Sequence, residues 1–385
     1  MRKARPLIDA DKVNAFLTGM FEQDLHARRV LSLANATTGV IHAASLSVHA
    51  IGLGLARAEG LESKHAIKQV DRLLSNTGID VWELFEQWVP FLLAGRTEAV
   101  VALDWTEFDA DNQSTIAIHL VTSHGRATPL VWKTVVKSEL KGWRNDHEDA
   151  VIARLLEVVP KDLKVTLLAD RGFGDQKLFA LLKRWNCDYV IRFREGIAVT
   201  DEAGETRKAK DWVPANGRPV LLRNASITRD QTPLPAVVCV KAEGMKEAWC
   251  LATSLSDQTA AEVVKLYSRR FTIEESFRDS KNARYGFGLS QSRVSVPARR
   301  DRLFLISALA IALLTLLGAA GESLGFERLM KANTVKRRSY SLLRQGCHYY
   351  ECIPAMKPEK LKLLLAKFAE LVTAQSLFRD VFGLL

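Results

Sequence analysis

The chain has 385 residues, more than one ordinary domain needs, so we expect a main core with one or two appended units. Its 54 lysines and arginines exceed its 44 acidic residues, and the net charge of +10 favours a polyanionic partner such as nucleic acid. The 5 cysteines lack the spacing of a disulfide framework, which argues against a secreted disulfide-rich protein and favours a reducing compartment. The basic N-terminus turns acidic before any apolar run, so we expect no signal peptide.

The first part of the chain, residues 1–95, is predicted to be helical, because polar and apolar positions recur at helical spacing through LESKHAIKQVDRLLSN. From Glu98 the period changes. Three consecutive strands separated by turn residues are predicted in EAVVALDWTEF, STIAIHLVTS and TPLVWKTVVKS, and we expect them to form an antiparallel meander. A helix then leads into the strand KVTLLAD, and a second helix leads into DYVIRF, which gives the order β-β-β-α-β-α-β.

The rest of the chain divides by pattern into further segments. Turn-rich, strand-like sequence at 196–255 is predicted to be a β-rich insertion between the halves of an α/β core. Helices follow to the end of the chain. The predicted organisation is therefore a helical N-terminal region at 1–95, core segments at 96–195 and 256–320 separated by the insertion, and a helical C-terminal region at 321–385.

One apolar segment, Leu303 to Ala320, has no charged residue over 18 positions, which is the minimum length for a membrane span. Arginines flank it on the N-terminal side, as they would flank a span that follows the positive-inside rule. The segment stands alone, however, contains Ser307 and Thr315, and is soon followed by Glu322. We therefore favour a core helix surrounded by protein.

Two aspartates follow apolar runs that are predicted to be neighbouring strands. Asp104 ends VVALD and Asp170 ends TLLAD, so a mixed sheet of this order places both carboxylates together. Glu274, on the apolar side of a later helix, can complete the group. Three convergent carboxylates repel one another unless cations hold them, and oxygen ligands suit Mg²⁺ or Mn²⁺. Two such ions promote in-line phosphoryl displacement.

Other interpretations of these residues remain open. An aspartate at a strand end is often a turn or helix-cap residue. Arg270 and Glu274, four positions apart on a helix, are also the spacing of a surface ion pair. Cys347, His348 and Cys352 resemble part of a metal site, but they lack a second ligand pair, and ordinary thiols are the favoured interpretation.

The segment YSRRFTIEESFRDSK, which begins at Tyr267, is predicted to be one helix. At about 100° per residue, Tyr267, Arg270, Glu274 and Lys281 share a stripe about 60° wide within the apolar half of the helix. The opposite face is expected to carry Ser268, Arg269, Thr272, Ser276, Asp279 and Ser280. Charges on the apolar side are costly unless a ligand uses them.

These residues resemble a family signature. Tyr267, Arg270, Glu274 and Lys281 reproduce the Y-(2)-R-(3)-E-(6)-K pattern of a bacterial insertion-sequence family of DDE transposases. Asp104 in LDWTEF and Asp170 in LADRGFGD stand in contexts similar to the first and second catalytic aspartates of that family, and the similarity covers most of the chain.

The resemblance implies a ribonuclease H-like α/β fold, with the β-rich insertion before the glutamate helix. It implies that Asp104, Asp170 and Glu274 hold two Mg²⁺ ions, or Mn²⁺, and catalyse the reaction. Other residues are expected to contact DNA: Tyr267, Arg270 and Lys281 at the backbone, Trp249 against a flipped base, and Arg171 at a phosphate.

The regions outside the core carry weaker predictions. Lys64, Lys68 and Arg72 share one helix face, which either contacts the terminal inverted repeats or is simply solvated. The arginines of a second run are candidates for DNA contact: Arg293, Arg299, Arg300 and Arg302. By analogy the C-terminal helices pair subunits in a homodimer, because synapsis brings two DNA ends together.

The predicted function is cut-and-paste transposition in the bacterial cytoplasm, in association with the nucleoid and not with a membrane. The protein is expected to bind double-stranded DNA at the transposon's terminal inverted repeats, to cleave it through hairpin ends, and to join the 3′ ends to target DNA. Two alternatives remain: a metal-dependent nuclease without strand transfer, and a noncatalytic DNA-binding protein derived from a transposase.

Overall fold

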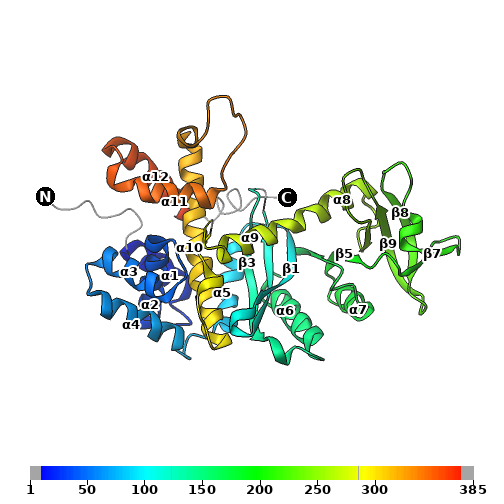
Figure 1. The fold of residues 1–385 in the computed structure, drawn as a ribbon, viewed down its shortest axis with the longest axis horizontal. Helices are drawn as coiled ribbons and strands as arrows, with labels where there is room; N and C mark the ends of the chain where they lie inside the picture. Colours follow the sequence, from blue (N-terminus) through cyan, green and yellow to red (C-terminus); the bar gives the residue numbers. More distant parts are fainter. Residues whose placement is uncertain (1–9, 123, 285, 374–385) are drawn as a thin grey trace.

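The computed structural model describes residues 10–122, 124–284 and 286–373. Its N-terminal part is helical, as predicted. The helices are α1 (Ala10–Phe21), α2 (Ala27–Ala43), α3 (Val48–Glu59), α4 (Ser63–Ser75) and α5 (Val81–Leu93). Helices α1 to α4 lie at one end of the elongated molecule, and α5 lies between them and the sheet (Figure 1). The apolar faces of all five helices join the same hydrophobic core as the sheet.

The central sheet has the predicted order of elements. It contains β1 (Glu98–Phe108), β2 (Gln113–Val121), β3 (Ala127–Val136), α6 (Arg144–Val158), β4 (Lys164–Ala169), α7 (Gln176–Arg184) and β5 (Asp188–Phe193). Strands β1, β2 and β3 form the predicted antiparallel meander. Strand β4 lies parallel to both β1 and β5. This mixed sheet with helical regions on either side of it in the sequence confirms the predicted ribonuclease H-like α/β fold.

The insertion extends the central sheet. Its strands are β6 (Ala198–Thr200), β7 (Thr206–Lys208), β8 (Val220–Ile227), β9 (Thr232–Val240) and β10 (Trp249–Thr253). Because β10 pairs with β5, the described residues form one sheet of 10 strands in the order β3-β2-β1-β4-β5-β10-β9-β8-β6-β7. The insertion lies at the end of the molecule opposite the N-terminal helices (Figure 1).

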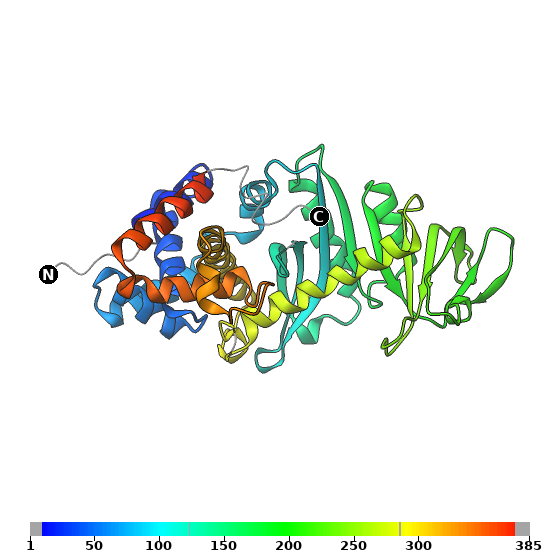
Figure 2. The same cartoon turned by 90° about the horizontal axis from the view of Figure 1, so that it is seen from above.

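The predicted helix that starts near Tyr267 is divided in two. Helix α8 (Ala260–Ser268) is followed by a 3-10 turn, η4 (Arg269–Phe271), and then by α9 (Thr272–Lys281). Figure 2 shows these helices running one after the other across the sheet. The chain continues into α10 (Pro297–Ser323), α11 (Leu342–Cys352) and α12 (Pro358–Thr373).

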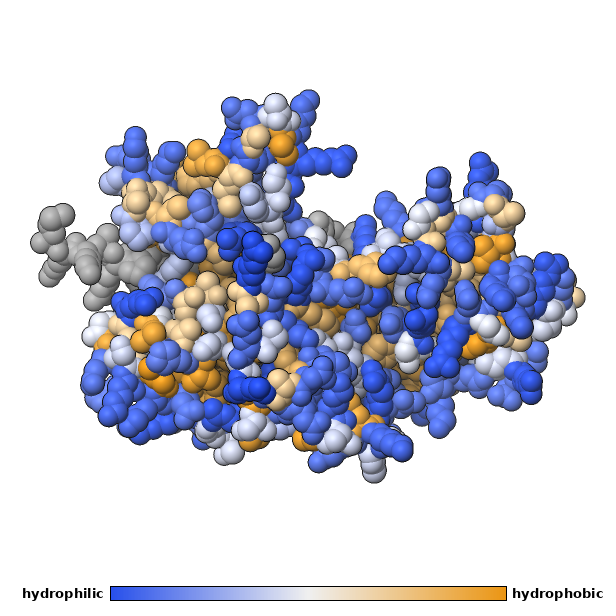
Figure 3. All heavy atoms as spheres, in the orientation of Figure 1, coloured by the Kyte–Doolittle hydropathy of each residue, from blue (hydrophilic) through white to orange (hydrophobic). Residues whose placement is uncertain are grey.

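Helix α10 is long and apolar enough to cross a membrane, but protein covers it. Of its most apolar window, with a mean hydropathy of 2.5, 89% is buried. It packs against α2, α11, α12 and β3. On the face that Figure 3 shows, hydrophilic residues dominate and hydrophobic ones gather in small groups. The structure therefore supports the interpretation of this segment as a core helix. The successive helices α2 and α3 pass the same composition test together, but they are bent by 96°.

Arg300 and Arg302, which precede the apolar run, connect α10 to neighbouring segments by hydrogen bonds. Arg300 is 0% exposed and donates to the side chains of Asp111 and Gln113. Arg302, also buried, donates to the carbonyl oxygens of Ile79 and Leu74. The prediction that these two arginines contact DNA is wrong, because folding buries them against β2 and the loop that precedes α5.

Two glycines allow α10 and α11 to approach closely. A Cβ on Gly346 would lie 1.8 Å from the carbonyl oxygen of Leu314, and one on Gly318 would lie 1.9 Å from that of Leu342. Any larger residue must push the helices apart. By contrast, a Cβ on Gly19 in α1 meets no atom of the described residues within 4 Å.

We expect Gly346→Ala to lower the free energy of unfolding by about 3 kcal/mol, because the added methyl group overpacks the contact between the helices. The control Gly19→Ala should raise it by about 0.5–1 kcal/mol, since alanine is the better helix former and has room. Urea unfolding followed by circular dichroism measures both. Equal effects of the two substitutions would contradict the close packing of α10 and α11.

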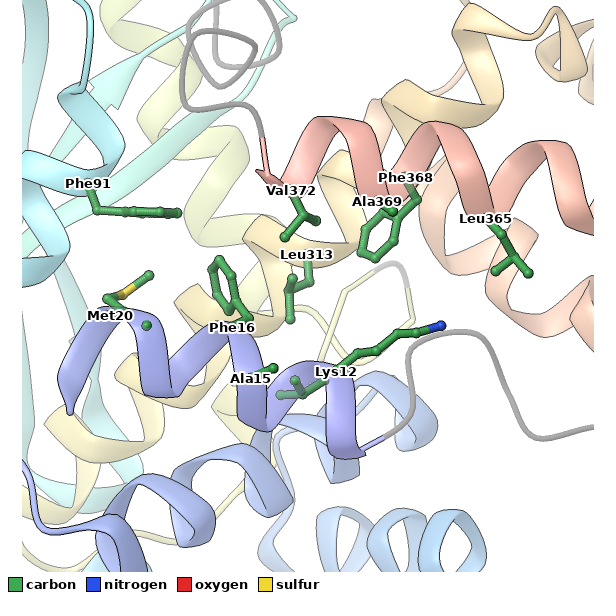
Figure 4. Close-up of a pocket in the computed structure, with 12 residues that line it drawn as sticks. Lys12, Ala15, Phe16, Met20, Phe91, Leu313, Leu365, Phe368, Ala369 and Val372 are labelled. Carbon is green, nitrogen blue, oxygen red and sulfur yellow. The ribbon is translucent and has the colours of Figure 1, made fainter.

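An apolar pocket of about 480 Å³ lies between α1, α10 and α12 (Figure 4). Phe16, Met20, Leu313 and Phe368 are among its lining residues. Among the described residues that line it, Lys12 carries a charge and none is a carboxylate. The pocket is thus separate from the predicted metal ligands.

Candidate active site

The parallel pairing of β1 and β4 places the two predicted aspartates side by side. Leu103 and Ala169 are the last residues paired between these strands, and Asp104 and Asp170 follow them directly. Strand β1 covers the predicted segment EAVVALDWTEF in full, so Asp104 lies within the strand and not at its end. The strand continues to Phe108 because its other neighbour, β2, goes on pairing with it.

Arg270 connects the strand carboxylate to the helix carboxylate. Its Nη1 donates to Asp104 Oδ2 at 3.2 Å, and its Nη2 donates to Glu274 Oε1 at 2.7 Å. The arginine is 5% exposed. Its Nε has no hydrogen-bond acceptor among the described residues. The structure thus brings Asp104 and Glu274 together around one buried cation from η4.

The neighbouring charged residues and burial together shift the pKa of Asp104. Burial raises the pKa of the Asp104 carboxyl to about 6, Arg270 opposes the rise, and the neighbouring charges of Asp170 and Glu274 add to it. Asp170 therefore belongs to the same electrostatic environment. Its Oδ1 accepts a hydrogen bond from the backbone N–H of Gly172 at 2.7 Å, which fixes the start of the loop after β4.

The three carboxylates supply only oxygen ligands, the kind that Mg²⁺ and Mn²⁺ prefer. Even so, the part of the chain that the structure describes has no group of three histidine, cysteine or acidic residues already arranged around a metal position. This applies equally to Cys347, His348 and Cys352, although Cys352 Sγ lies 3.6 Å from His348 Nε2. Arg270 instead supplies the positive charge between Asp104 and Glu274.

Tyr267 and Lys281, the outer members of the signature, both have protein partners. Tyr267 is 1% exposed, and burial raises the pKa of its phenol to about 12. Lys281 Nζ donates to Thr106 Oγ1 at 3.0 Å and to the carbonyl oxygen of Glu107 at 2.6 Å. In this conformation the ring of Tyr267 packs edge-on against Trp249, and the hydrogen bonds of Lys281 connect α9 to the end of β1. Their contact with DNA stays a prediction.

Trp249 lies at the start of β10, beside η4. Its ring centroid is 5.0 Å from that of Tyr267 and 5.8 Å from that of Phe271, and Phe271 is exposed. The tryptophan is partly buried. The structure thus places an accessible aromatic surface near Arg270, where the resemblance predicts that a base is received.

Arg171 is exposed and forms an ion pair with Glu247 at 2.9 Å. Arg192, on β5, contacts the same carboxylate oxygen at 2.7 Å. The sequence reasoning did not single out Arg192 or Glu247. An arginine inside the apolar strand DYVIRF was the available signal, because a charge at such a position usually has a specific partner.

The inner face of α9 is more polar than the helical wheel predicted. Ser276 and Ser280 are buried, although they were expected on the opposite face. Ser276 Oγ lies 3.1 Å from Nδ1 of His119 on β2, and the ring of Phe277 packs edge-on against His119. The helical wheel assigned the buried face of α9 wrongly, because the side that carries Ile273, Ser276, Phe277 and Ser280 is the buried one, while the side chain of Glu274 is half-exposed.

The burial of His119 gives a prediction about how the stability of the protein depends on pH. Burial lowers the pKa of His119 from 6.5 to about 3, so the unfolded chain binds a proton that the folded chain excludes. The contribution of His119 to stability is complete above pH 6.5 and is lost as the pH falls toward 3. Between pH 7 and pH 5 we expect the free energy of unfolding of the wild-type protein to fall by about 2 kcal/mol more than that of His119→Gln. Urea unfolding at each pH measures both values. An identical pH dependence would contradict this assignment.

The remaining basic candidates differ in exposure. Lys64, Lys68 and Arg72 lie on the exposed face of α4. The side chain of Arg293 is 74% exposed and lies 3.7 Å from Asp111. These positions are accessible, and their contact with DNA stays a prediction.

Residues 95–313 match the family model described as Transposase DDE domain. The chain belongs to this family. The match includes the sheet, the insertion and both helices that flank η4, and it ends within α10. A comparison of the sequence with curated proteins gave no match.

DDE transposases are metal-dependent, DNA-cleaving enzymes that carry out transposition. The family therefore accounts for the basic net charge of the chain. It does not establish the subfamily with the Y-(2)-R-(3)-E-(6)-K signature.

Proposed function

We propose that this DDE transposase belongs to the signature subfamily and moves an insertion sequence by cut-and-paste transposition. It binds the terminal inverted repeats, excises the element through hairpin ends and joins the 3′ ends to target DNA. One observation carries the proposal: Arg270 joins Asp104 and Glu274 beside the point where Asp170 leaves β4.

The three carboxylates have the proposed role of metal ligands. Asp104, Asp170 and Glu274 would hold two divalent ions, Mg²⁺ or Mn²⁺, which supply activation of a water or 3′-hydroxyl and stabilisation of the leaving oxygen. The carboxylate of Asp104 must be deprotonated to bind a cation, and its raised pKa favours the protonated form at acidic pH. Arg270 lowers the repulsion between the carboxylates in the absence of the ions.

Arg270 is also placed to act on DNA. Its guanidinium lies between two carboxylates, and its Nε points to no acceptor in the described structure. Because a guanidinium binds phosphate oxygens in a bidentate manner, it can exchange a carboxylate for a backbone phosphate once the ions neutralise the acids. Tyr267 and Lys281 then hold the helices around it, and Lys281 and Arg171 extend the cationic surface.

A flipped base is proposed to stack on Trp249. Phe271 provides a second exposed ring beside it. Stacking on an aromatic side chain offsets part of the energy lost when a base leaves the duplex. This assignment places the base near the carboxylates, where the strand is cut.

The outer regions are proposed to organise the complex. The exposed basic face of α4 is proposed to contact the inverted repeats, and the C-terminal helices are proposed to pair two subunits in a homodimer. Part of the C-terminal region lies outside the described residues. The segment boundaries at 95, 195, 255 and 320 belong to the same proposal, as does a location in the bacterial cytoplasm at the nucleoid.

Two experiments test the proposed function. Sequencing of the DNA that flanks the gene should show short inverted repeats bounded by duplicated target bases. Purified protein, incubated with precleaved repeat ends, a plasmid and Mg²⁺, should yield joined products. Cleavage without joined products would identify a nuclease, and specific binding without cleavage would identify a noncatalytic DNA-binding protein.

A further inference from the structure

Glu247 is held between two arginines next to the candidate active site. It lies in the loop that connects β9 to β10, two positions before Trp249. Its Oε2 accepts hydrogen bonds from Arg171 at 2.9 Å and from Arg192 at 2.7 Å. Arg171 directly follows Asp170, and Arg192 comes from β5. Three separate segments therefore converge on one carboxylate oxygen.

The surroundings of this carboxylate suit an anion from outside the protein. Two guanidinium groups on a single oxygen form the arrangement that a phosphate oxygen also accepts. Further exposed cations lie in the adjoining segments: Arg194, Lys241 and Lys246. Exposed acids in these segments are Glu195 and Glu243. The carboxylate of Glu247 thus occupies the two guanidinium groups, which lie close in the chain or in space to both Asp170 and Trp249.

The bonds to Glu247 are easily exchanged. The side chains of Glu247 and Arg171 are 50% and 54% exposed, so their ion pair contributes little to stability in water. Arg192 is less exposed and has a second acceptor, the carbonyl oxygen of Ala248 at 3.1 Å. Arg192 can therefore keep its position when Glu247 leaves.

We propose that, in the DNA-free protein, Glu247 takes the place of one phosphodiester of the transposon end, and that the bound DNA displaces it. This inference rests on the proposed function, because it needs a DNA strand that passes between Asp170 and Trp249. Glu247 then competes with the phosphate for Arg171 and Arg192. Its carboxylate lowers the affinity for DNA and neutralises the two arginines until an end is bound.

Glu247→Gln tests the competition, because glutamine keeps the size of the side chain and removes its charge. We expect the dissociation constant for a duplex that ends at the inverted repeat to fall about three- to tenfold at low salt, and the gain to shrink as salt rises. Glu243→Gln is the matched control, since it removes the same charge from the same loop. Its effect should be less than about twofold. In an Arg171→Gln background, Glu247→Gln should give a smaller gain.

The possible outcomes separate the explanations. Equal gains from Glu247→Gln and Glu243→Gln would show only a general charge effect and overturn the proposal. Weaker binding by Glu247→Gln would also overturn it, because Glu247 would then position the arginines for DNA. Preference of the wild-type protein for the repeat duplex over a scrambled duplex tests the proposed function independently. Absence of this preference would contradict the proposed function, whereas absence of a specific effect of Glu247→Gln would contradict only the competition.

Discussion

Glu274→Gln is expected to reduce DNA cleavage by at least about a thousandfold, while binding to the repeat duplex persists. The substitution removes the charge of a proposed metal ligand but keeps the shape of the side chain. It also weakens the bond to Arg270, whose Nη2 lies 2.7 Å from Glu274 Oε1. A cleavage assay with Mg²⁺ and a gel-shift assay measure the two properties. Cleavage that survives the change would show that Glu274 is not a catalytic carboxylate.

The neighbouring Glu275 supplies a matched control on the same helix. Its carboxylate forms ion pairs with Arg278 and Arg126, away from Asp104. Glu275→Gln makes the same chemical change one position along α9 and should leave the cleavage rate within about threefold of the wild type. A comparable loss in both variants would indicate that α9 needs its negative charge generally, and would remove the support for a specific role of Glu274.

The sequence predicted those features that depend on neighbouring residues. The apolar runs of β1 and β4 determine two strands, and parallel pairing then places Asp104 beside Asp170. The spacing of Arg270 and Glu274 likewise puts them on one side of a helical segment. Such patterns are local, so a single sequence contains enough information to recognise them.

The features that the sequence did not predict depend on distant partners. A run of arginines has the same pattern whether its members are solvated or buried, and Arg300 is 189 positions from Asp111, which neutralises it. Glu247 and Arg192 are likewise separated by 55 positions. Burial of Ser276 follows from its contact with His119 on another element. These contacts are properties of the tertiary structure, and no periodicity within a segment specifies them.

Arg300→Ala is expected to lower the free energy of unfolding by about 3–5 kcal/mol, because it leaves the buried carboxylate of Asp111 without its nearest cation. Arg300 is fully buried and also lies over the ring of Phe108 at 3.8 Å. Its Nε donates to Gln113, whose amide in turn donates to the carbonyl oxygen of Val294. The arginine thus joins the start of β2 to the segment that leads into α10.

Arg293→Ala provides the comparison for this loss, because Arg293 reaches the same Asp111 from the surface. At a separation of 3.7 Å and an exposure of 74%, its ion pair should contribute no more than about 0.5 kcal/mol. Urea unfolding of the two variants separates a buried structural arginine from an exposed one. If Arg300→Ala folded as stably as the wild type and instead bound DNA more weakly, the arginine would have to leave its site at Asp111 to contact DNA. Its burial would then describe only the DNA-free state.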